Sequence, residues 1–266
     1  MNLLNKKFIK LKKQNKKALS IFITAGYPDF DFTQKLIFEL EKIRVDIIEI
    51  GIPFSDPIAD GPVIQKSSYE SLKKGTSLKK VLRFICKIKN RISIPIVIMS
   101  YLNPINKYGM SKFFSDARKA GVDGIIIPDI IFEESREIET ISRKYNIPLI
   151  YLVAPTTSIK RRKEILKKSK GFIYVVSVTG VTGPREKLPE DLQDFLKNLR
   201  NSTKKPLMLG FGISRPQQII PIKKYIDGII IGSAIIRIIS KTRKKEVFDK
   251  IENFINSFRK VLKNGK

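Results

Sequence analysis

The stretch from Asp46 to Pro62 carries the residues best placed to do chemistry. It reads DIIEIGIPFSDPIADGP and begins as an isoleucine-rich run, a composition typical of a strand buried on both faces. This run contains one carboxylate, Glu49, near its end. An ionised side chain there costs free energy unless it has a partner or a use. The sequence therefore favours a functional role for Glu49, with a structural ion pair to a neighbouring Lys or Arg as the alternative.

A polar loop follows the Glu49 strand. Its prolines stiffen the backbone, while Asp56 and Asp60 keep it acidic. A buried carboxylate next to an acidic loop predicts a site.

Absent residue types narrow the chemistry. The chain contains no histidine, which excludes a Ser-His-Asp triad, a His-ligated metal centre and a histidine general base. Carboxylates, tyrosines and lysines remain. The one cysteine, Cys86, lies in the alternation VLRFICKIKN, which favours a packed helical thiol over a nucleophile. Because one cysteine cannot form a disulfide within the chain, a reducing cytoplasm is the simplest location.

The charge balance bears on partners. Lys and Arg number 52 against 25 Asp and Glu, a formal charge of +27. The lysines are spread over almost every predicted helix and loop, so we interpret most as solvated helix faces and expect no specific nucleic-acid site. Salt-sensitive, nonspecific binding to polyanions stays open. The first residues lack the apolar core of a secretory signal, and no run is long enough to span a membrane.

The elements that must position these residues form one alternating series. We expect eight strands, each followed by a helix, in a chain of 266 residues with 42% hydrophobic residues. This predicts an α/β fold, a (β/α)8 TIM barrel, with residues 1–266 as a single domain. Extra helices are expected at the N-terminus, with Leu4, Phe8 and Leu11 on one stripe, and in short form after strands two and eight. The strands are expected at 18–26, 46–51, 94–102, 124–129, 147–155, 171–177, 206–212 and 227–233, and one of the helices around 216–224.

The strand starts alternate in residue type. Proline introduces the third, fifth and seventh strands, whereas aspartate introduces the second, fourth and eighth, at Asp46, Asp123 and Asp227. Alternation between odd and even strands suits a barrel, whose interior layers are filled by alternate strands. Coincidence or a habit of the family remains the alternative.

Polar residues also gather at the predicted carboxyl ends of strands, where barrels of this kind build their active sites. Tyr101 and Asn103 follow the third strand, Asp129 follows the fourth, and Tyr174 lies inside the sixth. Each has a structural explanation when taken alone: turn chemistry before Pro104, capping of the next helix by Asp129, and packing of the Tyr174 ring.

Three glycine-rich stretches occupy 180–184, 210–214 and 232–234. Glycine lets backbone N–H groups approach an anion, and a helix that opens after Ser233 would add the positive end of its dipole. The loops after strands seven and eight are the usual phosphate site of such barrels. Since no GxxxxGK[ST] or GxGxxG occurs, a small phosphate ester is favoured over a nucleotide. Turn glycines without a ligand are the alternative.

Five strings give a resemblance to a known family. IEIGIPFSDPIADGP, SYLNPINKYG, SVTGVTG, LGFGIS and IIGSAI occur at the expected intervals and closely resemble the tryptophan synthase α-subunit family over essentially the whole chain. The resemblance implies a barrel that cleaves indole-3-glycerol phosphate by retro-aldol chemistry into indole and glyceraldehyde 3-phosphate, without a cofactor or metal. It also implies a β-subunit partner in an α2β2 complex, to which indole is passed.

Residue roles follow from the matched strings. By resemblance, Glu49 is expected to protonate the indole ring at C3 and to assist removal of the glycerol hydroxyl proton. Asp60 is expected to accept a hydrogen bond from the indole N–H and to stabilise the developing cation. Thr182 matches the loop residue that engages Asp60 on closure, and Pro53 and Asp56 match positions that contact the β subunit. The other matched positions are Phe22, Tyr101, Tyr174 and Phe211 in the indole and glycerol pocket, and Gly183, Gly212, Gly232 and Ser233 around the phosphate.

Two carboxylates can run this reaction without histidine, provided that Glu49 holds a proton when needed. We therefore expect burial to raise the pKa of Glu49. Val178 departs from members of the family that carry arginine there, which leaves loop closure and its coupling to the β subunit open. Two alternatives to the complex remain: a lyase that works alone and releases indole, and a barrel retained chiefly to activate a partner or to hold RNA.

Overall fold

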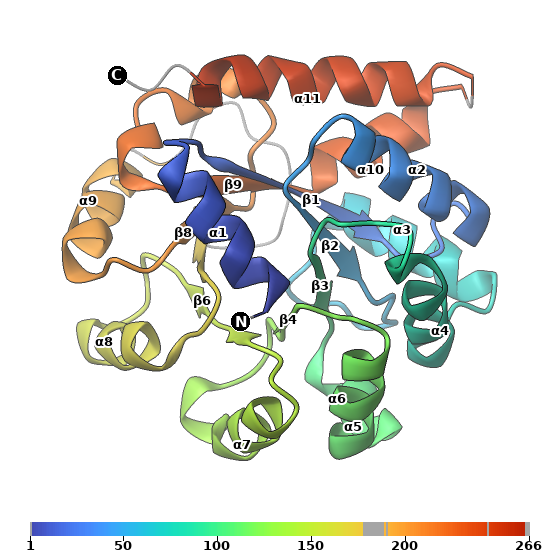
Figure 1. The fold of residues 1–266 in the computed structure, drawn as a ribbon, viewed down its shortest axis with the longest axis horizontal. Coiled ribbons are helices and arrows are strands. Elements are labelled where there is room, and N and C mark those ends of the chain that lie inside the picture. The colour runs from blue at the N-terminus through green and yellow to red at the C-terminus, as the bar shows by residue number, and fades with distance from the viewer. Residues whose placement is uncertain (1, 178–188, 190, 244, 264–266) are drawn as a thin grey trace.

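The computed structural model describes residues 2–177, 189, 191–243 and 245–263 (Figure 1). Its strands are parallel and form one sheet in the order β5-β4-β3-β2-β1-β9-β8-β7-β6. In Figure 1 the strands lie at the centre with the helices around them. The strands are β1 (Ala18–Thr24), β2 (Ile47–Gly51), β3 (Ile96–Met99), β4 (Gly124–Ile126), β5 (Leu149–Ile150), β6 (Leu152–Val153), β7 (Ile173–Val176), β8 (Leu207–Gly210) and β9 (Gly228–Ile231).

The two outer strands of this order, β5 and β6, are pieces of one predicted strand that is interrupted at Tyr151. Because these pieces are consecutive in the chain, the two ends of the sheet meet. The nine short strands thus make the eight-stranded barrel that the sequence predicted.

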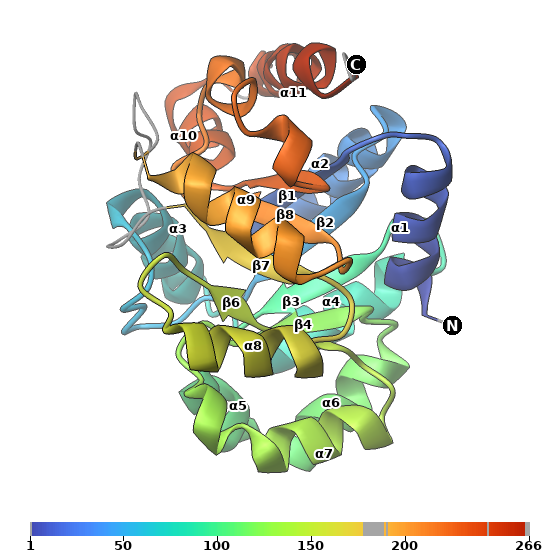
Figure 2. The ribbon, with the colours of Figure 1, turned by 90° about the vertical axis from the view of Figure 1, so that its left-hand side faces the viewer.

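Helices surround the barrel because the strand side chains alternate between two cores. Ile48 and Ile50, for example, pack outward, whereas Ile47 packs inside the barrel. The predicted short helices after the second and eighth strands are confirmed as α3 (Pro62–Lys73) and α10 (Ser233–Lys241). Figure 2 shows α11 on one side of the barrel and α5 to α7 on the opposite side. The other helices are α2 (Phe30–Lys42), α4 (Leu78–Lys89), α5 (Leu102–Tyr108), α6 (Met110–Lys119), α7 (Arg136–Lys144), α8 (Ile159–Lys168), α9 (Leu192–Ser202) and α11 (Val247–Lys263).

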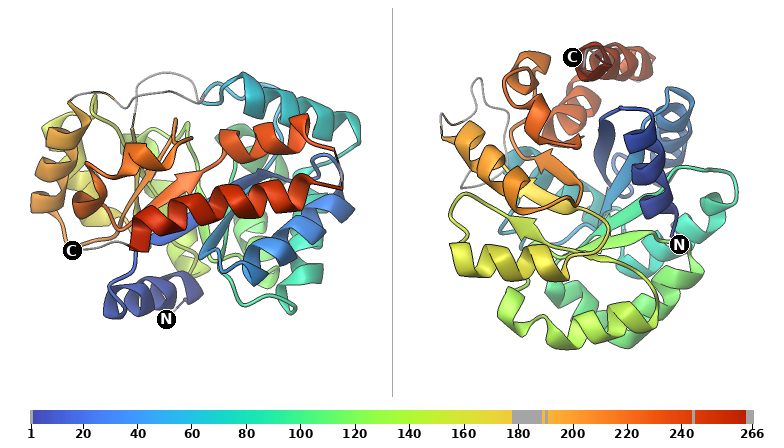
Figure 3. Two further views of the ribbon diagram at one scale, coloured as in Figure 1. Left: turned by 90° about the horizontal axis from the view of Figure 1, so that it is seen from above. Right: turned by 60° about the vertical axis from the view of Figure 1, so that its left-hand side comes forward.

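The predicted N-terminal helix, α1 (Leu3–Lys13), lies across one end of the barrel (Figure 3). Its stripe of Leu4, Phe8 and Leu11 is buried in the same cluster as the interior strand residues. Phe8 packs against Phe172, with ring centroids 5.8 Å apart. The helix therefore closes the amino-terminal end of the barrel, away from the ends where a site is expected.

Three sequence expectations were wrong. The helix expected around 216–224 is two 3₁₀ turns, η2 (Pro216–Ile219) and η3 (Lys223–Tyr225), because Pro221 between them lacks the N–H that an α-helix needs. Asn103 lies in α5 and not in a turn, since Pro104 falls in the first helical turn, where proline is tolerated. Cys86 is exposed on α4 and is not packed, because the buried stripe of that helix passes beside it.

Hydrogen bonds show what the aspartates at the strand starts do. Each of the three aspartates opens one strand and accepts a backbone N–H from the start of the preceding strand: Asp46 from Leu19 at 3.1 Å, Asp123 from Ile96 at 3.0 Å and Asp227 from Leu207 at 2.8 Å. These bonds give the aspartates at the starts of the second, fourth and eighth strands a structural role, since each satisfies a backbone N–H of the neighbouring strand.

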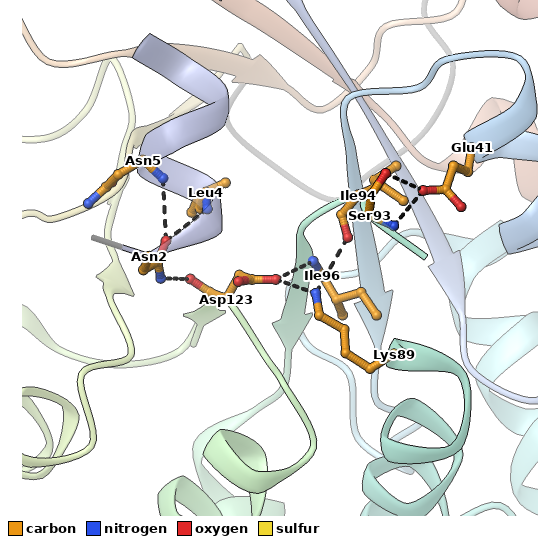
Figure 4. A network of polar contacts seen from close by, with 9 residues as sticks. All are labelled: Asn2, Leu4, Asn5, Glu41, Lys89, Ser93, Ile94, Ile96 and Asp123. Atoms are coloured by element: carbon orange, nitrogen blue, oxygen red, sulfur yellow. Dashed lines mark hydrogen bonds and ion pairs between the residues drawn. The ribbon is translucent and has the colours of Figure 1, made fainter. Parts of the chain in front are cut away.

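The hydrogen bonds around Asp123 connect three elements at the amino-terminal end of the barrel, which we call the barrel floor (Figure 4). Its carboxylate also receives Lys89 from α4 at 2.6 Å, and its backbone carbonyl accepts the side-chain amide of Asn2, which caps α1. One residue therefore fixes a strand start, a flanking helix and the helix that closes the barrel.

Candidate active site

Glu49 lies in the middle of β2, paired between Phe22 of β1 and Val97 of β3. The period of two that sends Ile48 and Ile50 outward turns Glu49 into the barrel. Its side chain is completely buried, with an exposed fraction of 0%. The strand register therefore forces a carboxyl group into an otherwise apolar interior.

The surroundings of Glu49 favour its protonated form. One oxygen, Oε1, accepts a hydrogen bond from the Ser20 hydroxyl at 2.8 Å, and the other, Oε2, is buried without a hydrogen-bond partner. Burial raises the pKa of Glu49 to about 8, against the opposing effect of the Ser20 bond. Among the described residues, no Lys or Arg forms an ion pair with it, so the structure does not support the ion-pair alternative.

Asp60 is the second carboxylate of the site and lies just before α3. It is nearly buried and accepts a hydrogen bond from the Tyr101 hydroxyl at 3.0 Å. That hydroxyl in turn accepts the backbone N–H of Ala59 at 3.0 Å. Burial raises the pKa of Asp60 to about 6, which the Tyr101 bond opposes. At neutral pH Asp60 is therefore mainly ionised while Glu49 is mainly protonated.

Tyr174 lies near enough to both carboxylates for their charges to act on its hydroxyl. It points into the barrel from β7, and burial together with the charges of Glu49 and Asp60 raises its pKa well above the ordinary value for tyrosine. Both acidic groups therefore act on one buried ring, as expected if they serve a common site.

A cavity at this end of the barrel brings most of the predicted residues together. The space left among the side chains is about 30 Å³, room for roughly one water molecule. Glu49 does not line the space itself; it lies beside the lining residue Phe22. The lining residues are Phe22, Asp60, Ile64, Met99, Tyr174, Phe211, Gly212, Ile213, Ile230, Gly232 and Ser233.

Phe211 enters the cavity from a constrained backbone. Its φ of 66° lies in the left-handed region, which costs a phenylalanine about 1–2 kcal/mol. The Ser177 hydroxyl donates to the Phe211 carbonyl, and the Phe211 ring meets Tyr174 edge-on with centroids 5.7 Å apart. An outlier of this kind beside a cavity is typical of a functional site.

Comparisons with known proteins agree with this geometry. A family model described as "Tryptophan synthase alpha chain" matches residues 8–263. The tryptophan synthase alpha chain of Caldanaerobacter subterraneus subsp. tengcongensis is 46% identical over 263 residues, which cover 98% of this chain and 100% of the relative. The chain belongs to the tryptophan synthase alpha chain family.

Solved structures extend the match to three dimensions. Tryptophan synthase subunit alpha from Legionella pneumophila str. Paris is 34% identical, with a TM-score of 0.91 and complete coverage of both chains. A tryptophan synthase structure from Mycobacterium tuberculosis is 28% identical, with a TM-score of 0.88 over 98% of each chain. As an alpha chain of this family, the protein is a lyase that cleaves indole-3-glycerol phosphate in tryptophan biosynthesis and works with the β subunit.

The glycine residues that the resemblance assigns to phosphate lie at one side of the cavity. Gly232 precedes α10, and the first N–H groups of that helix, from Ser233 onward, have no partners within the helix. A Cβ on Gly232 would lie 3.2 Å from Phe22, so the backbone packs closely on that ring. This arrangement suits an anion bound between α10 and Gly212. Thr182 and Gly183 lie outside the described residues, as does Val178.

The predicted partner-contact residues lie on the loop between β2 and α3. Pro53 is buried, whereas Asp56 is exposed and accepts a hydrogen bond from Ser55. Between Asp56 and Asp60, Ile58 is 75% exposed. The loop thus presents a charge and an apolar side chain on its outer surface and Asp60 on its inner one.

Asp129 serves the fold, whereas Tyr101 belongs to the site. The Asp129 carboxylate accepts the backbone N–H of Leu102 at 3.0 Å, so it caps the start of α5 and not the next helix along the chain. Tyr101 precedes that helix and turns its hydroxyl to Asp60.

Sequence reasoning missed three residues of the site. The Ser20 hydroxyl donates a hydrogen bond to Glu49. The sequence could have indicated this residue, because serine is a polar residue within the otherwise apolar start of the strand ALSIFIT. Gly51 and Gly210 make room for aromatic rings: a Cβ on Gly51 would lie 2.4 Å from the Phe22 ring, and one on Gly210 would lie 2.4 Å from the Tyr174 hydroxyl. Neither glycine stands out in sequence, because only the register shows which ring lies opposite.

No group of three or more Cys, Asp or Glu residues in the described part of the chain could hold a metal ion. Over those same residues, no helix is both long and apolar enough to cross a bilayer.

Proposed function

We propose that Glu49 is the acid/base of indole-3-glycerol phosphate cleavage and that Asp60 stabilises the charge that develops on the ring nitrogen. The observation that carries this proposal is the separation of their pKa values: burial raises Glu49 to about 8 and Asp60 only to about 6. At neutral pH one group can give a proton while the other carries a negative charge.

Glu49 gives its proton to C3 of the indole ring, and the positive charge that forms on the ring nitrogen is stabilised by the Asp60 carboxylate, which accepts the ring N–H. The ionised Glu49 then takes the proton of the neighbouring glycerol hydroxyl. The oxygen electrons form the aldehyde, the carbon–carbon bond breaks, and its electron pair returns to the ring. Indole and glyceraldehyde 3-phosphate leave, and Glu49 is protonated again.

The apolar and glycine residues hold the two ends of the substrate in this proposal. Phe22, Tyr174 and Phe211 enclose the indole and glycerol part, and Tyr101 fixes Asp60. The phosphate is bound by the backbone around Gly212, Gly232 and Ser233, and the family resemblance adds Thr182 and Gly183, which lie outside the described residues. The whole chain, residues 1–266, works as one barrel domain.

Glu49→Gln tests the catalytic assignment. We expect loss of indole formation by at least about 10³-fold, since the amide cannot transfer the proton. Glu39→Gln is the matched control, because Glu39 is an exposed carboxylate that forms an ion pair with Lys42 on α2. Activation of the β subunit by Glu49→Gln separates the lyase from a barrel kept only to bind a partner: activation should persist while cleavage is lost. Normal cleavage by Glu49→Gln would reject the proposal.

We also propose that the β subunit docks on the face that holds the active site. Three isoleucines follow strands whose carboxyl ends lie there: Ile58 is 75% exposed, Ile131 51% and Ile159 69%. Together with Asp56 they give this face exposed apolar side chains and a charge, a composition that suits a protein interface, and the buried Pro53 lies in the same loop as Ile58 and Asp56. Ile58→Ser should weaken β-subunit binding, whereas Ile9→Ser on α1, at the opposite end of the barrel, should not. Equal binding by both variants would place the interface elsewhere.

A working complex should speed cleavage when β subunit is added, whereas a lyase that works alone should not respond. We place the protein in the cytoplasm, because its one thiol, Cys86, is free and exposed and tryptophan biosynthesis supplies its substrate there.

A further inference from the structure

Ser20 places a hydroxyl inside the barrel, next to Glu49. It lies in β1 between Leu19 and Ile21, which pack outward, and is completely buried, with an exposed fraction of 0%. Its hydroxyl has two acceptors within reach: Oε1 of Glu49 at 2.8 Å and the carbonyl of Ile47 at 3.4 Å. A hydroxyl has one proton to donate, and the shorter distance assigns it to Glu49.

The two oxygens of Glu49 are therefore not equivalent. Oε1 is occupied by Ser20, whereas Oε2 is buried and has no hydrogen-bond partner. A carboxylic acid whose one oxygen already accepts a hydrogen bond carries its own proton on the other. We propose that Ser20 is a positioning residue that occupies Oε1 of Glu49 and so keeps the transferable proton on Oε2.

This arrangement serves both halves of the reaction. When Glu49 is protonated, Ser20 donates to the carbonyl-like Oε1 and the acidic proton on Oε2 is free to move to carbon. When Glu49 is ionised, the same Ser20 bond holds the carboxylate in place and leaves Oε2 to collect the hydroxyl proton. No side chain has to turn between the two steps. This inference depends on the proposed role of Glu49.

Other groups near Glu49 do not replace Ser20. Tyr174 approaches from β7, and Asp60 approaches from the loop before α3. The charges of Glu49 and Asp60 both act on the Tyr174 hydroxyl. Burial is the larger effect and raises the pKa of Glu49. Among the described residues, the Ser20 bond is the only polar contact that opposes it by lowering that pKa. Removing it should therefore raise the pKa of Glu49 and let the carboxyl group rotate.

The test compares Ser20→Ala, Ser20→Cys and Ser20→Thr in the full chain with β subunit present. The titration of Glu49 is followed by ¹³C NMR of side-chain carboxyl groups, with Glu49→Gln to assign the signal. We expect Ser20→Ala to shift the Glu49 titration upward by about one pH unit and to lower kcat by about 10-fold, with KM nearly unchanged because Ser20 does not line the cavity. Ser20→Thr should restore both readouts, and Ser20→Cys, a weak donor of similar size, should lie between.

Ser142→Ala is the control for loss of a buried serine hydroxyl, since Ser142 on α7 donates to the Ile147 carbonyl. An unchanged titration and kcat in Ser20→Ala would overturn the inference. So would equal losses in Ser20→Ala and Ser20→Thr, which would indicate packing alone. If Glu49→Gln keeps its activity, the proposed function itself fails, whatever the Ser20 variants do.

Discussion

The Tyr101 hydroxyl lies 3.0 Å from Oδ2 of Asp60 and donates a hydrogen bond to it. Tyr101 follows β3 and Asp60 follows β2, so the bond joins two neighbouring loops at the carboxyl ends of their strands. It also aims the Asp60 carboxylate, which an unsupported loop would leave free to turn. The contact between these two residues therefore orients the group that is proposed to stabilise the ring cation.

Tyr101→Phe should remove that support while keeping the ring, which packs on Phe54 with centroids 5.3 Å apart. Because the Tyr101 bond lowers the pKa of Asp60, its loss should raise that pKa above about 6 and reduce kcat/KM by about 10-fold near pH 7. Tyr108→Phe removes a similar bond, to Asp116 at 2.8 Å, outside the site and is the matched control. Equal losses in the two variants would contradict a specific role for Tyr101.

The pH dependence of kcat/KM should be bell-shaped. Asp60 must be ionised, so activity should fall as pH drops through about 6, and Glu49 must be protonated, so activity should fall as pH rises through about 8. Initial rates of indole formation across this range, in buffers of constant ionic strength, measure both limbs. A flat profile from neutral pH to well above 8 would show that Glu49 is not the proton donor.

Folding stability should also respond to Glu49. Its pKa rises from 4.5 in the unfolded chain to about 8 in the fold, so between these values the folded protein holds a proton that the unfolded chain has released. The free energy of unfolding is therefore highest below pH 4.5 and falls as the pH rises from there through about 8, by at most about 5 kcal/mol in total. A glutamine at this position does not titrate, so its contribution to the free energy of unfolding should not change with pH.

Urea unfolding measures this effect. Glu49→Gln should match the wild-type free energy of unfolding near pH 4.5, exceed it increasingly as the pH rises to about 8, and exceed it by a constant amount above that. A difference between the two proteins that does not vary with pH would mean that Glu49 does not titrate with the fold.

Gly210→Ala tests the space behind Tyr174. The new Cβ would lie 2.4 Å from the Tyr174 hydroxyl oxygen, so the ring would have to move toward the cavity or the strands would have to part. We expect a loss of about 1–3 kcal/mol in the free energy of unfolding and a marked rise in KM. Circular dichroism shows whether the barrel persists, and unchanged kinetics would mean that the ring has room to move.

The barrel was predictable because its strands are nearly pure apolar runs separated by amphipathic helices. Glu49 and Asp60 stood out as carboxylates at the end of such a run, and Gly232 and Ser233 stood out at the start of a helix. The resemblance to the family supplied their roles. Local patterns failed where proline decides the outcome: Pro221 divides an expected helix, and Pro104 lies in the first turn of a helix where a turn was expected.

The contacts that complete the site could not be read from the sequence, because they depend on register. Ser20 meets Glu49 only because β1 and β2 pair Ser20 with Ile47, which places Glu49 two residues further along the same face. Gly210 meets Tyr174 for a comparable reason. The interruption at Tyr151 likewise depends on hydrogen bonds between strands, which hydrophobicity does not show.

The aspartates of the barrel floor divide the ring into joined pairs. Asp46 joins β1 to β2, Asp123 joins β3 to β4, and Asp227 joins β8 to β9, whereas the strand that opens at Gly171 has no such residue. If the chain is cut between two of these pairs, the two ends of each aspartate bond stay in the same fragment. Separately expressed halves divided after β4 should reassociate more readily than halves divided inside a pair, and this floor suits a fold assembled from two-stranded modules.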